Sequence, residues 1–301
     1  MRFAVMGAGS IGCYFGALLA RAGEEVTLIG RKHHIDAINQ RGLLLEIGQQ
    51  SYAVPIKATV HANGVADADV VLVCVKSDDT EAAGRQVAPY LNDDAILLSL
   101  QNGVDNAQRL AAIVDRTVVP VAVYVATAMA GPGHVKHYGR GDLVIGACPK
   151  EKEITDRFGA AGIPVEVSAS AIEALWAKLI LNCAYNPLSA LTRLPYGQML
   201  SVTGMETLVR NIVEECCAVA RAAGVAVPAD ILANVLALAA TMPQQTSSTA
   251  QDLAAKRRTE IDHLNGFMVR EGARLGIPTP VNQALHTLVK GAEIEARQVH
   301  R

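Results

Sequence analysis

The sequence lacks the patterns that mark several common protein classes. Its 301 residues carry a net charge of only −2 and no long block of like charge, so the basic surface typical of nucleic-acid-binding proteins is missing. Its six cysteines show no CxxC spacing, and no HExxH motif or comparable histidine cluster offers a metal site. We therefore expect reduced thiols in a cytoplasmic protein without a disulfide framework, a metal ion or a nucleic-acid partner.

Long apolar segments are also scarce. Residues 3–20 contain no charge, which is long enough to resemble a signal peptide or a membrane span. Four glycines interrupt this segment, however, and the residues before the first glycine resemble a short buried strand. No other segment approaches the ~18 apolar residues that a membrane helix needs. We interpret residues 3–20 as the start of a folded domain and expect no membrane partner.

Half of the residues are hydrophobic, and their order along the chain predicts a first domain of α/β type. A strand–turn–helix–strand pattern covers residues 2–31. Further strands are expected within 68–77, 95–103, 117–129 and 141–147, with helical patterns such as 78–91 between them. Strands that alternate with helices indicate a doubly wound, Rossmann-type parallel sheet.

Beyond about residue 168 the patterns are helical. Ser170 and Glu173 have the spacing of a capping box and predict a helix start. The residue before Pro187 is biased away from helical angles, so we expect a kink or break near Asn186. Further helices are expected over 205–224, 228–242, 247–276 and 280–298. The sequence thus predicts a dinucleotide-binding domain over 1–168 and an all-helical, substrate-binding domain over 169–301.

A glycine-rich turn follows the first expected strand. Residues 7–12 read GAGSIG and fit the pattern GxGxxG, in the strand-to-helix setting that this pattern requires. The glycines permit a tight turn and close approach of the backbone to a pyrophosphate, which the free N–H groups of a helix N-terminus can bind. The expected cofactor-binding residues of this turn are Gly7, Ala8, Gly9, Ser10, Ile11 and Gly12.

Three more residues follow expected strands. Arg31 ends the second strand, where NAD sites usually have an acidic residue, and a basic residue there favours the 2′-phosphate of NADP(H). Lys76 and Asn102 come after two further apolar runs, at carboxyl ends of parallel strands, where ligands bind in such sheets. The alternatives are a solvated Arg31, a surface charge at Lys76 and an ordinary Asn-Gly turn at Asn102.

A line of polar residues runs along an otherwise apolar helix in the second domain. Lys178, Asn182 and Asn186 recur every four residues and therefore share one face. Each unpaired buried polar group would destabilise the fold by ~1–3 kcal/mol. Three such groups on one face therefore favour a surface that faces a ligand. The alternative is a lysine that extends to solvent, beside two amides that are hydrogen-bonded to the backbone. A partly buried lysine has a lowered pKa, so it can donate a proton to a bound molecule and stabilise negative charge that develops on it.

These segments together resemble the ketopantoate reductase family over nearly the whole chain. The resemblance is carried by GAGSIG, Arg31, VCVKS around Lys76 and QNG at Asn102, and most specifically by WAKLILNCAYNPLSAL at 176–191 and RRTEIDHLNGF at 257–267. It implies NADPH-dependent reduction of 2-dehydropantoate to D-pantoate in pantothenate biosynthesis, on the route to coenzyme A.

The resemblance also implies roles for the residues just described. Lys178 matches the general acid of the family, and Asn182 and Asn186 match residues that hold the substrate. Lys76 and Asn102 match residues beside the nicotinamide half of the cofactor, and Asn102 is expected to contact the substrate as well.

Two further residues become site candidates only through the resemblance. Glu260 matches a glutamate close to the cofactor and the reacting centre, and Ser248 matches a serine that helps to bind substrate. By spacing alone, Glu260 would form an ordinary surface ladder with Asp252 and Lys256 on one helix, and Ser248 would lie near a helix start.

One position departs from the family pattern. Tyr196 stands where some members carry an asparagine, so reduction of another 2-keto acid on the same scaffold is an alternative function. A non-catalytic NADP sensor is a second alternative, but it would have no need of the polar residues of the helical domain. A homodimer is a possible assembly.

Overall fold

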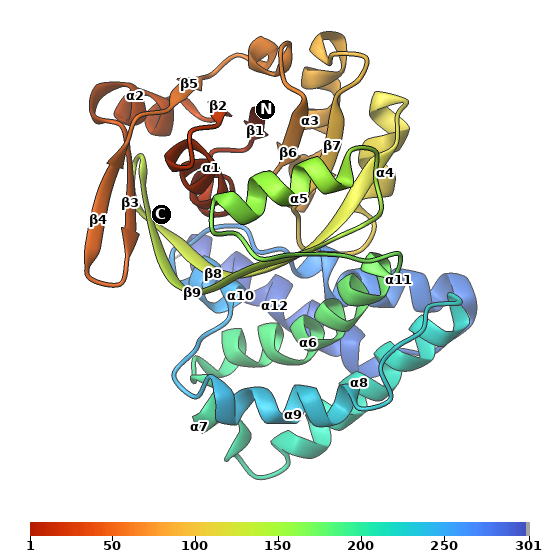
Figure 1. Cartoon of the computed structure of the whole chain (residues 1–301). Coiled ribbons are helices and arrows are strands. Elements are labelled where there is room, and N and C mark those ends of the chain that lie inside the picture. Colours follow the sequence, from red (N-terminus) through yellow and green to blue (C-terminus); the bar gives the residue numbers. More distant parts are fainter. Residues whose placement is uncertain (299–301) are drawn as a thin grey trace. The chain divides into compact units, whose positions relative to one another are not determined.

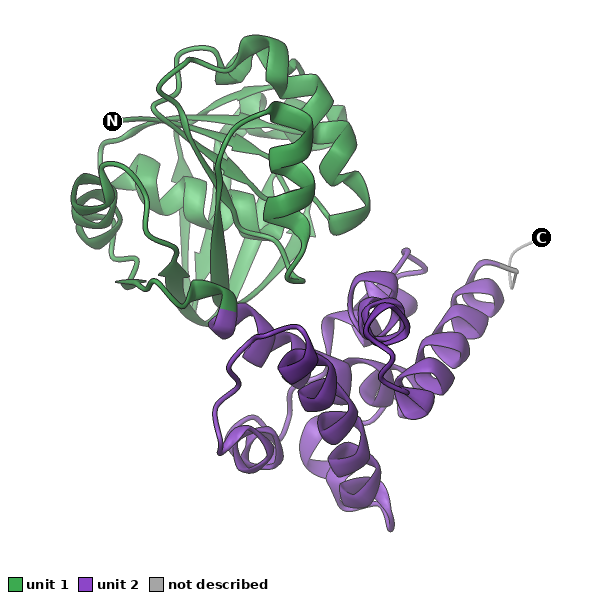
Figure 2. Ribbon diagram, turned by 90° about the vertical axis from the view of Figure 1, so that its right-hand side faces the viewer, with its two compact units in different colours: residues 1–172 green, residues 173–301 purple. Residues whose placement is uncertain are grey.

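The computed structural model describes residues 1–298, and the chain divides into two compact units, Met1–Ile172 and Glu173–Arg301 (Figure 2). Unit 1 is an α/β unit built on a single sheet. Within residues 173–298, unit 2 contains only helices. The predicted fold class, a Rossmann-type sheet followed by an all-helical region, is confirmed.

The sheet of unit 1 has ten strands in the order β4-β3-β9-β8-β7-β6-β1-β2-β5, with β10 beside β9 (Figure 1). The strands are β1 Arg2–Met6, β2 Glu25–Ile29, β3 Leu43–Ile47, β4 Gln50–Val54, β5 Lys57–Thr59, β6 Val70–Val73, β7 Ile96–Ser99, β8 Val118–Gly131, β9 His134–Ile145 and β10 Val165–Val167. The central strands β7, β6, β1 and β2 are parallel, as predicted.

The sheet is not parallel throughout, and in this the sequence analysis was incomplete. Strands β8 and β9 form a long antiparallel hairpin, and β3 and β4 form a second one that was not predicted. Gly133, with a φ of +62°, lies between β8 and β9 and permits the tight reversal that a hairpin needs. The chain therefore extends the parallel core on one side with antiparallel pairs.

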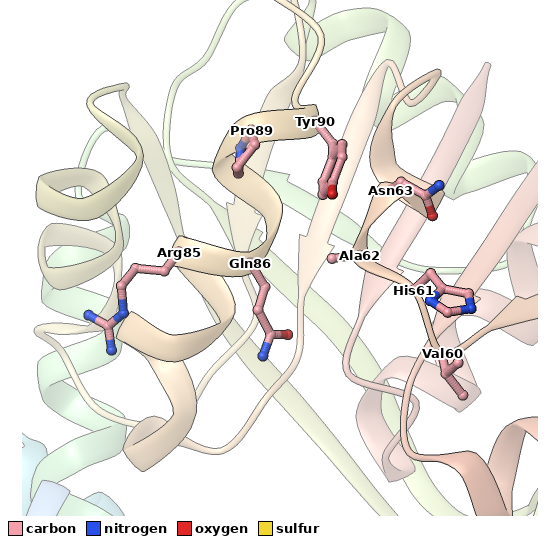
Figure 3. Close-up of a pocket in the computed structure, with 8 residues that line it drawn as sticks. All are labelled: Val60, His61, Ala62, Asn63, Arg85, Gln86, Pro89 and Tyr90. Atoms are coloured by element: carbon pink, nitrogen blue, oxygen red, sulfur yellow. The ribbon is translucent and has the colours of Figure 1, made fainter.

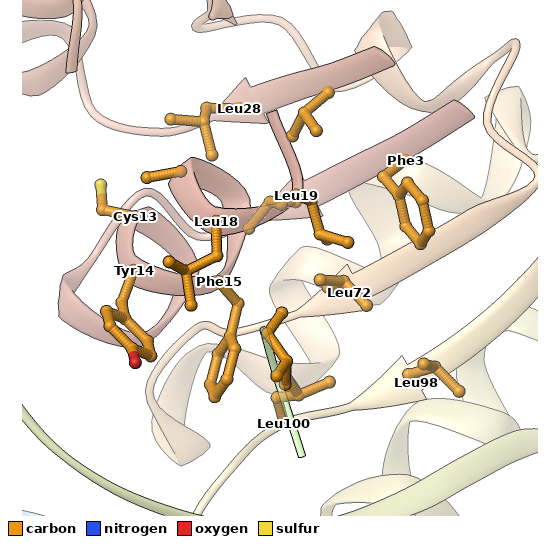
Figure 4. Packing of buried hydrophobic residues seen from close by; sticks show 14 of the residues in the cluster. Phe3, Cys13, Tyr14, Phe15, Leu18, Leu19, Leu28, Leu72, Leu98 and Leu100 are labelled. Carbon is orange, nitrogen blue, oxygen red and sulfur yellow. The ribbon is translucent and has the colours of Figure 1, made fainter. Parts of the chain in front are cut away.

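The helices of unit 1 cover the sheet. They are α1 Ser10–Arg21, α2 Lys32–Arg41, α3 Thr80–Val87, α4 Asn106–Val114 and α5 Glu151–Ala160, with short 3₁₀ turns at η1 Ala62–Val65, η2 Ser77–Asp79 and η3 Ala88–Tyr90. Phe15 and Leu19 of α1 are fully buried in the cluster of Figure 4, which also contains Leu28 of β2 and Leu72 of β6. Burying such a side chain contributes about 1.5–3 kcal/mol, which holds α1 against the sheet.

Unit 2 is built from seven helices within residues 171–298: α6 Ala171–Thr192, α7 Tyr196–Leu200, α8 Met205–Ala222, α9 Ile231–Thr241, α10 Ser248–Ala254, α11 Asn265–Leu275 and α12 Pro280–Gln298, with a 3₁₀ turn η4 at Ile261–His263. We expected a kink or break near Asn186, and the break does not occur, because α6 continues through Pro187 to Thr192. In a regular helix the N–H of residue 187 would donate to the Cys183 carbonyl, but proline has no N–H group. The amide of Asn265 donates a hydrogen bond to this carbonyl.

The single long helix expected over 247–276 is wrong. The chain leaves α10 at a left-handed residue, Lys256, with a φ of +55°, and the N–H of Arg257 turns back to the Asp252 carbonyl at 2.8 Å. The side chain of Asp252 pairs with Arg257 Nε at 2.9 Å. The expected ladder of Asp252, Lys256 and Glu260 therefore does not exist on one helix, since Glu260 lies beyond the turn.

Long-range hydrogen bonds from α12 explain why the helix is interrupted here. The N–H and hydroxyl groups of Thr259 both donate to Glu293 Oε1, at 2.8 and 2.6 Å, and both residues are buried. Asp262 Oδ2 accepts from Lys290 Nζ at 2.8 Å, and Asp262 Oδ1 lies 2.6 Å from His286 Nε2. These bonds favour the irregular backbone of 256–263 over a continued helix.

The ionised carboxylate of Asp262 contributes to the stability of unit 2. Partial burial opposes ionisation, but the hydrogen bonds and charges of Lys290 and His286 outweigh it and hold the pKa of Asp262 well below its usual value. A group whose pKa is lower in the folded state stabilises the fold above its unfolded value of about 3.9. This contribution is lost as the pH falls through the folded-state value.

We predict that Asp262→Asn lowers the free energy of unfolding at pH 7 by about 1.5–3 kcal/mol, the usual contribution of hydrogen bonds to a charged group. Between pH 6 and pH 3 the variant should lose less stability than the wild type, because it lacks the titrating carboxylate. Urea unfolding followed by the fluorescence of Trp176, the one tryptophan of the chain and buried in unit 2, measures both effects.

Asp156→Asn is the control, since it removes an exposed ion pair with Lys152 that contributes little. Equal acid sensitivity of the Asp262→Asn variant and the wild type would contradict the prediction.

Candidate active site

The glycine-rich turn at residues 7–12 connects β1 to α1 and leaves room for a ligand. Gly7 has a φ of +114°, and a Cβ there would lie 2.7 Å from the Cys74 carbonyl carbon, so only glycine fits. The N–H groups of Gly7 and Ala8 donate to the Ile29 carbonyl at 2.9 and 3.0 Å, which ties the turn to the end of β2. A Cβ at Gly9 would meet no atom within 4 Å, so the backbone there is open to approach.

The N-terminus of α1 is well suited to bind an anion. Gly9 is the N-cap, no side chain caps the helix and its first turn contains no acidic residue. The first N–H groups of a helix lack helical acceptors, and the helix dipole adds a partial positive charge. The predicted turn therefore has the open backbone, donors and charge that a pyrophosphate group requires.

Arg31 follows β2 and is the N-cap residue of α2. Its side chain is 78% exposed, and its guanidinium lies 3.8 Å from the carboxylate of Asp79, which precedes α3. An exposed pair at this distance is weak, so the guanidinium can exchange this partner for an anionic group of a ligand. The neighbouring Lys32 is instead paired with Asp36 at 2.8 Å.

Lys76 and Asn102 follow β6 and β7, and buried side chains join their two loops. Asn106 Nδ2 donates to the Asn102 carbonyl at 2.6 Å and to Ser77 Oγ at 3.1 Å, and Ser77 Oγ donates to the same carbonyl at 2.9 Å. Asn106 is 2% exposed and Ser77 is fully buried. Sequence reasoning missed both residues, although each is a polar residue within a few positions of a predicted site residue.

These elements of unit 1 share one edge of the sheet. The glycine turn, Arg31, Lys76 and Asn102 follow β1, β2, β6 and β7, which are adjacent and parallel. Carboxyl ends of parallel strands form the ligand-binding edge of such sheets. The structure thus brings these predicted cofactor residues of unit 1 to the same edge, whereas Glu260, which was also predicted to lie close to the cofactor, belongs to unit 2.

In unit 2, the predicted polar line lies on one continuous helix. Lys178, Asn182 and Asn186 are on α6, and their four-residue spacing puts them on one face. Lys178 and Asn182 are partly exposed, whereas Asn186 is 4% exposed. Partial exposure of the first two leaves them accessible to a small molecule.

Ser248 lies beside this line, as the structure shows. Asn186 Nδ2 donates to Ser248 Oγ at 3.4 Å, across 62 residues of sequence. The preceding Ser247 caps α10 by accepting from the Ala250 N–H at 3.1 Å, and its hydroxyl donates to the Asn186 carbonyl at 3.2 Å. Sequence reasoning singled out Ser248 and missed Ser247, which docks the start of α10 on α6.

Glu260 lies on a turn between two anchored residues. Thr259 is held by Glu293, and Asp262 is held by Lys290 and His286. Glu260 itself is the N-cap residue of η4 and is partly exposed. The turn therefore presents a carboxylate from a backbone that is fixed on both sides.

Tyr196 belongs to the packed interior of unit 2. It is 7% exposed, and its ring centroid lies 4.5 Å from that of Tyr185 in a tilted arrangement. Burial raises the pKa of the Tyr196 phenol well above its usual value, so the phenol stays neutral. The departure from the family pattern at this position thus falls on a packing contact.

Other features of the described residues point to no competing site. A depression in unit 1, shown in Figure 3, contains none of the predicted site residues and is lined by Val60, His61, Ala62, Asn63, Arg85, Gln86, Pro89 and Tyr90. Residues 1–298 hold no group of three or more His, Cys, Asp or Glu side chains arranged for a metal ion. The same residues include no helix with the length and apolarity needed to span a membrane.

Comparison with known proteins gives matches over both units. A model of the family described as ketopantoate reductase PanE/ApbA matches residues 3–150, and one for its C-terminal part matches residues 170–293. A 2-dehydropantoate 2-reductase from Pyrococcus horikoshii is 33% identical over 298 residues, which cover 97% of this chain and 98% of the relative. One from Halobacterium salinarum is 34% identical, with 97% and 99% covered.

Solved structures agree with these matches. A PanE/ApbA family ketopantoate reductase from Ralstonia eutropha JMP134 has a TM-score of 0.96 and 51% identity, and the match covers 99% of this chain and 100% of that one. A D-mandelate dehydrogenase in complex with NADH and anilino(oxo)acetate has a TM-score of 0.92, with the same coverage, but only 24% identity, and therefore shows a shared fold. The resemblance noted in the sequence is confirmed: the chain belongs to the ketopantoate reductase family.

Proposed function

We propose that the protein is an NADPH-dependent 2-dehydropantoate 2-reductase, which converts this keto acid to D-pantoate as a cytoplasmic step of pantothenate biosynthesis. The main observation behind the proposal is that α6 is continuous and holds Lys178, Asn182 and Asn186 on one face, with Ser248 beside Asn186. Relatives named 2-dehydropantoate 2-reductase match 97% of the chain, which supports the same reaction here.

Residues of unit 1 are proposed to hold the cofactor. The N–H groups at the start of α1 would bind the pyrophosphate, and the open backbone at Gly9 fits its close approach. The exposed guanidinium of Arg31 would bind the 2′-phosphate that distinguishes NADPH from NADH. Lys76 and Asn102 would lie beside the nicotinamide half, on loops that Asn106 joins.

Residues of unit 2 are proposed to handle the substrate and the proton. When bound, a nicotinamide cofactor supplies hydride to the keto carbon, and negative charge develops on the carbonyl oxygen. The Lys178 ammonium stabilises this charge and donates a proton to the oxygen, which completes the hydroxy acid. The Asn182 and Asn186 amides and the Ser248 hydroxyl hold the polar groups of the substrate as neutral donors and acceptors, so they do not compete for the proton.

Glu260 is proposed to act at the same centre, close to both the cofactor and the substrate. Its carboxylate can accept a hydrogen bond from a substrate hydroxyl. The anchored residues on both sides of it, Thr259 and Asp262, limit its movement. A group that is held in place before binding loses less entropy when the substrate arrives.

A second candidate is reduction of a different 2-keto acid. The sequence raised it at Tyr196, the one position noted as departing from the family pattern, but the structure packs this residue on Tyr185 in the interior of unit 2. A structure of D-mandelate dehydrogenase shares the fold, so the scaffold occurs with another 2-hydroxy acid. Measuring NADPH oxidation against a panel that includes 2-dehydropantoate and phenylglyoxylate tests both candidates. Turnover of another acid alone would support the second candidate, and NADPH binding without any turnover would support a sensor.

The cofactor assignment predicts a selective effect of Arg31→Asp. We expect the Kd for NADPH to rise about tenfold to a hundredfold, because a charge-assisted hydrogen bond contributes roughly 1.5–3 kcal/mol, while the Kd for NADH changes little. Fluorescence titration with both cofactors measures the ratio. Lys32→Asp is the matched control, since this neighbouring cation is already paired with Asp36. An unchanged ratio of the two Kd values would remove Arg31 from the site.

The proton-transfer assignment predicts that Lys178→Ala lowers kcat by ~10²–10⁴-fold, the usual effect of losing a general acid. NADPH affinity should stay within a few-fold of wild type, because the residues proposed for the cofactor belong to unit 1. Asn182→Ala, four residues along the same face, should instead raise KM for the keto acid with a smaller loss in kcat. Steady-state kinetics beside NADPH titration separates these effects, and near-normal kcat in the Lys178→Ala protein would refute the mechanism.

A further inference from the structure

Pro187 creates a hydrogen-bonding problem in the middle of α6. In a regular helix the N–H of residue 187 would donate to the carbonyl of residue 183, but proline has no N–H. Cys183 is fully buried, so bulk water does not reach its carbonyl. An unpaired buried carbonyl destabilises a fold, and this one therefore needs a donor from elsewhere in unit 2.

Asn265, the first residue of α11, provides this donor. Its Nδ2 donates to the Cys183 carbonyl at 3.0 Å and to Asn282 Oδ1 at 2.9 Å, and Asn265 is fully buried. Asn265 belongs to the RRTEIDHLNGF segment, which is one of the most specific elements of the family resemblance, yet it has no role in the reaction proposed above. The structure thus links this segment to the helix that carries the polar line.

The orientation of the Asn265 amide is determined by its neighbours. Glu215 accepts from the N–H groups of Val281 and Asn282 at 2.9 and 3.0 Å and from Asn282 Nδ2 at 2.8 Å. A carboxylate only accepts, so Asn282 must turn its NH₂ group to Glu215 and its oxygen to Asn265. Asn265 must then present its NH₂ group to both Asn282 and Cys183. The donor at Cys183 is therefore pre-oriented by a buried chain of hydrogen bonds.

The carbonyl that Asn265 binds belongs to the segment of α6 that carries the polar line. Cys183 is next to Asn182, and the turn from Cys183 to Pro187 contains Asn186. Lys178 and Asn186 are eight residues apart, about 12 Å along a regular helix. A helix that has lost a hydrogen bond at a proline can bend there, which would move Asn186 relative to Lys178 and Asn182.

We propose that Asn265 is a positioning residue for substrate binding: by donating to the Cys183 carbonyl it replaces the hydrogen bond that Pro187 removes and keeps Asn186 in register with Lys178 and Asn182. The proposal rests on the proposed function of these three residues. It assigns to Asn265 an effect on the binding of the keto acid, through α6, without contact with the substrate.

The test is a double-variant cycle on the full chain with Asn265→Ala, Pro187→Ala and both together. In the double variant, residue 187 regains an N–H that can donate to the Cys183 carbonyl, so the need for Asn265 disappears. KM and kcat for 2-dehydropantoate, the Kd for NADPH and urea unfolding by Trp176 fluorescence are measured for each protein. Tyr185→Phe is the matched control, because it removes another buried hydrogen bond of unit 2, from the Tyr185 hydroxyl to the Val235 carbonyl at 2.8 Å, and leaves Asn265 and the Cys183 carbonyl unchanged.

We expect KM of Asn265→Ala to rise on the order of tenfold, as for loss of one buried hydrogen bond, with a smaller change in kcat and an unchanged Kd for NADPH. The double variant should return KM to within about threefold of wild type, because the two substitutions act on the same carbonyl and are not additive. Tyr185→Phe should lower stability and leave KM near the wild-type value.

Other results would overturn the proposal. An unchanged KM in Asn265→Ala, an equal rise in Tyr185→Phe, or a rise in Asn265→Ala that Pro187→Ala does not reverse would each make Asn265 a residue of general stability only. If Asn265→Ala does not fold, folding of the double variant supports the proposal and its failure to fold contradicts it. Absence of turnover in the wild type would overturn the proposed function and this inference together, whereas wild-type turnover with unchanged KM overturns the inference alone.

Discussion

A buried polar group destabilises a fold unless it is hydrogen-bonded, and much of unit 2 follows from this constraint. In the buried second half of helix α6, Pro187 leaves the Cys183 carbonyl without its helical donor, and the Asn186 side chain needs partners from other segments. Ser247 donates a hydrogen bond to the Asn186 carbonyl, and Asn265 donates one to the Cys183 carbonyl. These bonds hold the starts of α10 and α11 against α6, because Ser247 is the N-cap residue of α10 and Asn265 is the first residue of α11.

The same constraint applies to backbone groups at the edge of the sheet in unit 1 where the predicted cofactor residues lie. A helix N-terminus has N–H groups without acceptors, and α1 presents them beside an open glycine backbone at the end of β1. The loops after β6 and β7 contain buried polar side chains as well, and these satisfy one another through Asn106. Unit 1 thus contains most of the residues proposed to bind the dinucleotide, and unit 2 most of those proposed to bind the keto acid.

The local patterns predicted much of this arrangement. Apolar periodicity and glycine spacing predicted the unit from β1 to β2, the strands β6 and β7, and the helices α8, α9 and α12, since these elements depend mostly on neighbours in sequence. Two expectations were not met where distant residues act on local preference. The break expected near Asn186 does not occur, and Asn265 donates to the Cys183 carbonyl, for which Pro187 has no N–H group. The helix expected through residues 256–260 is interrupted where Glu293 binds Thr259 and Lys290 binds Asp262.

The sequence by itself determined the fold class, the glycine turn and the common face of Lys178, Asn182 and Asn186, because all three depend on the spacing of residues along one strand, turn or helix. Only the tertiary structure decided that Ser248 meets Asn186, that Glu260 lies on an anchored turn instead of a helix, and that Tyr196 packs on Tyr185. These contacts join residues that are far apart in the sequence. The hydrogen bonds and burial that favour them act between distant segments, and such contacts leave no repeating pattern in the sequence from which they could be predicted.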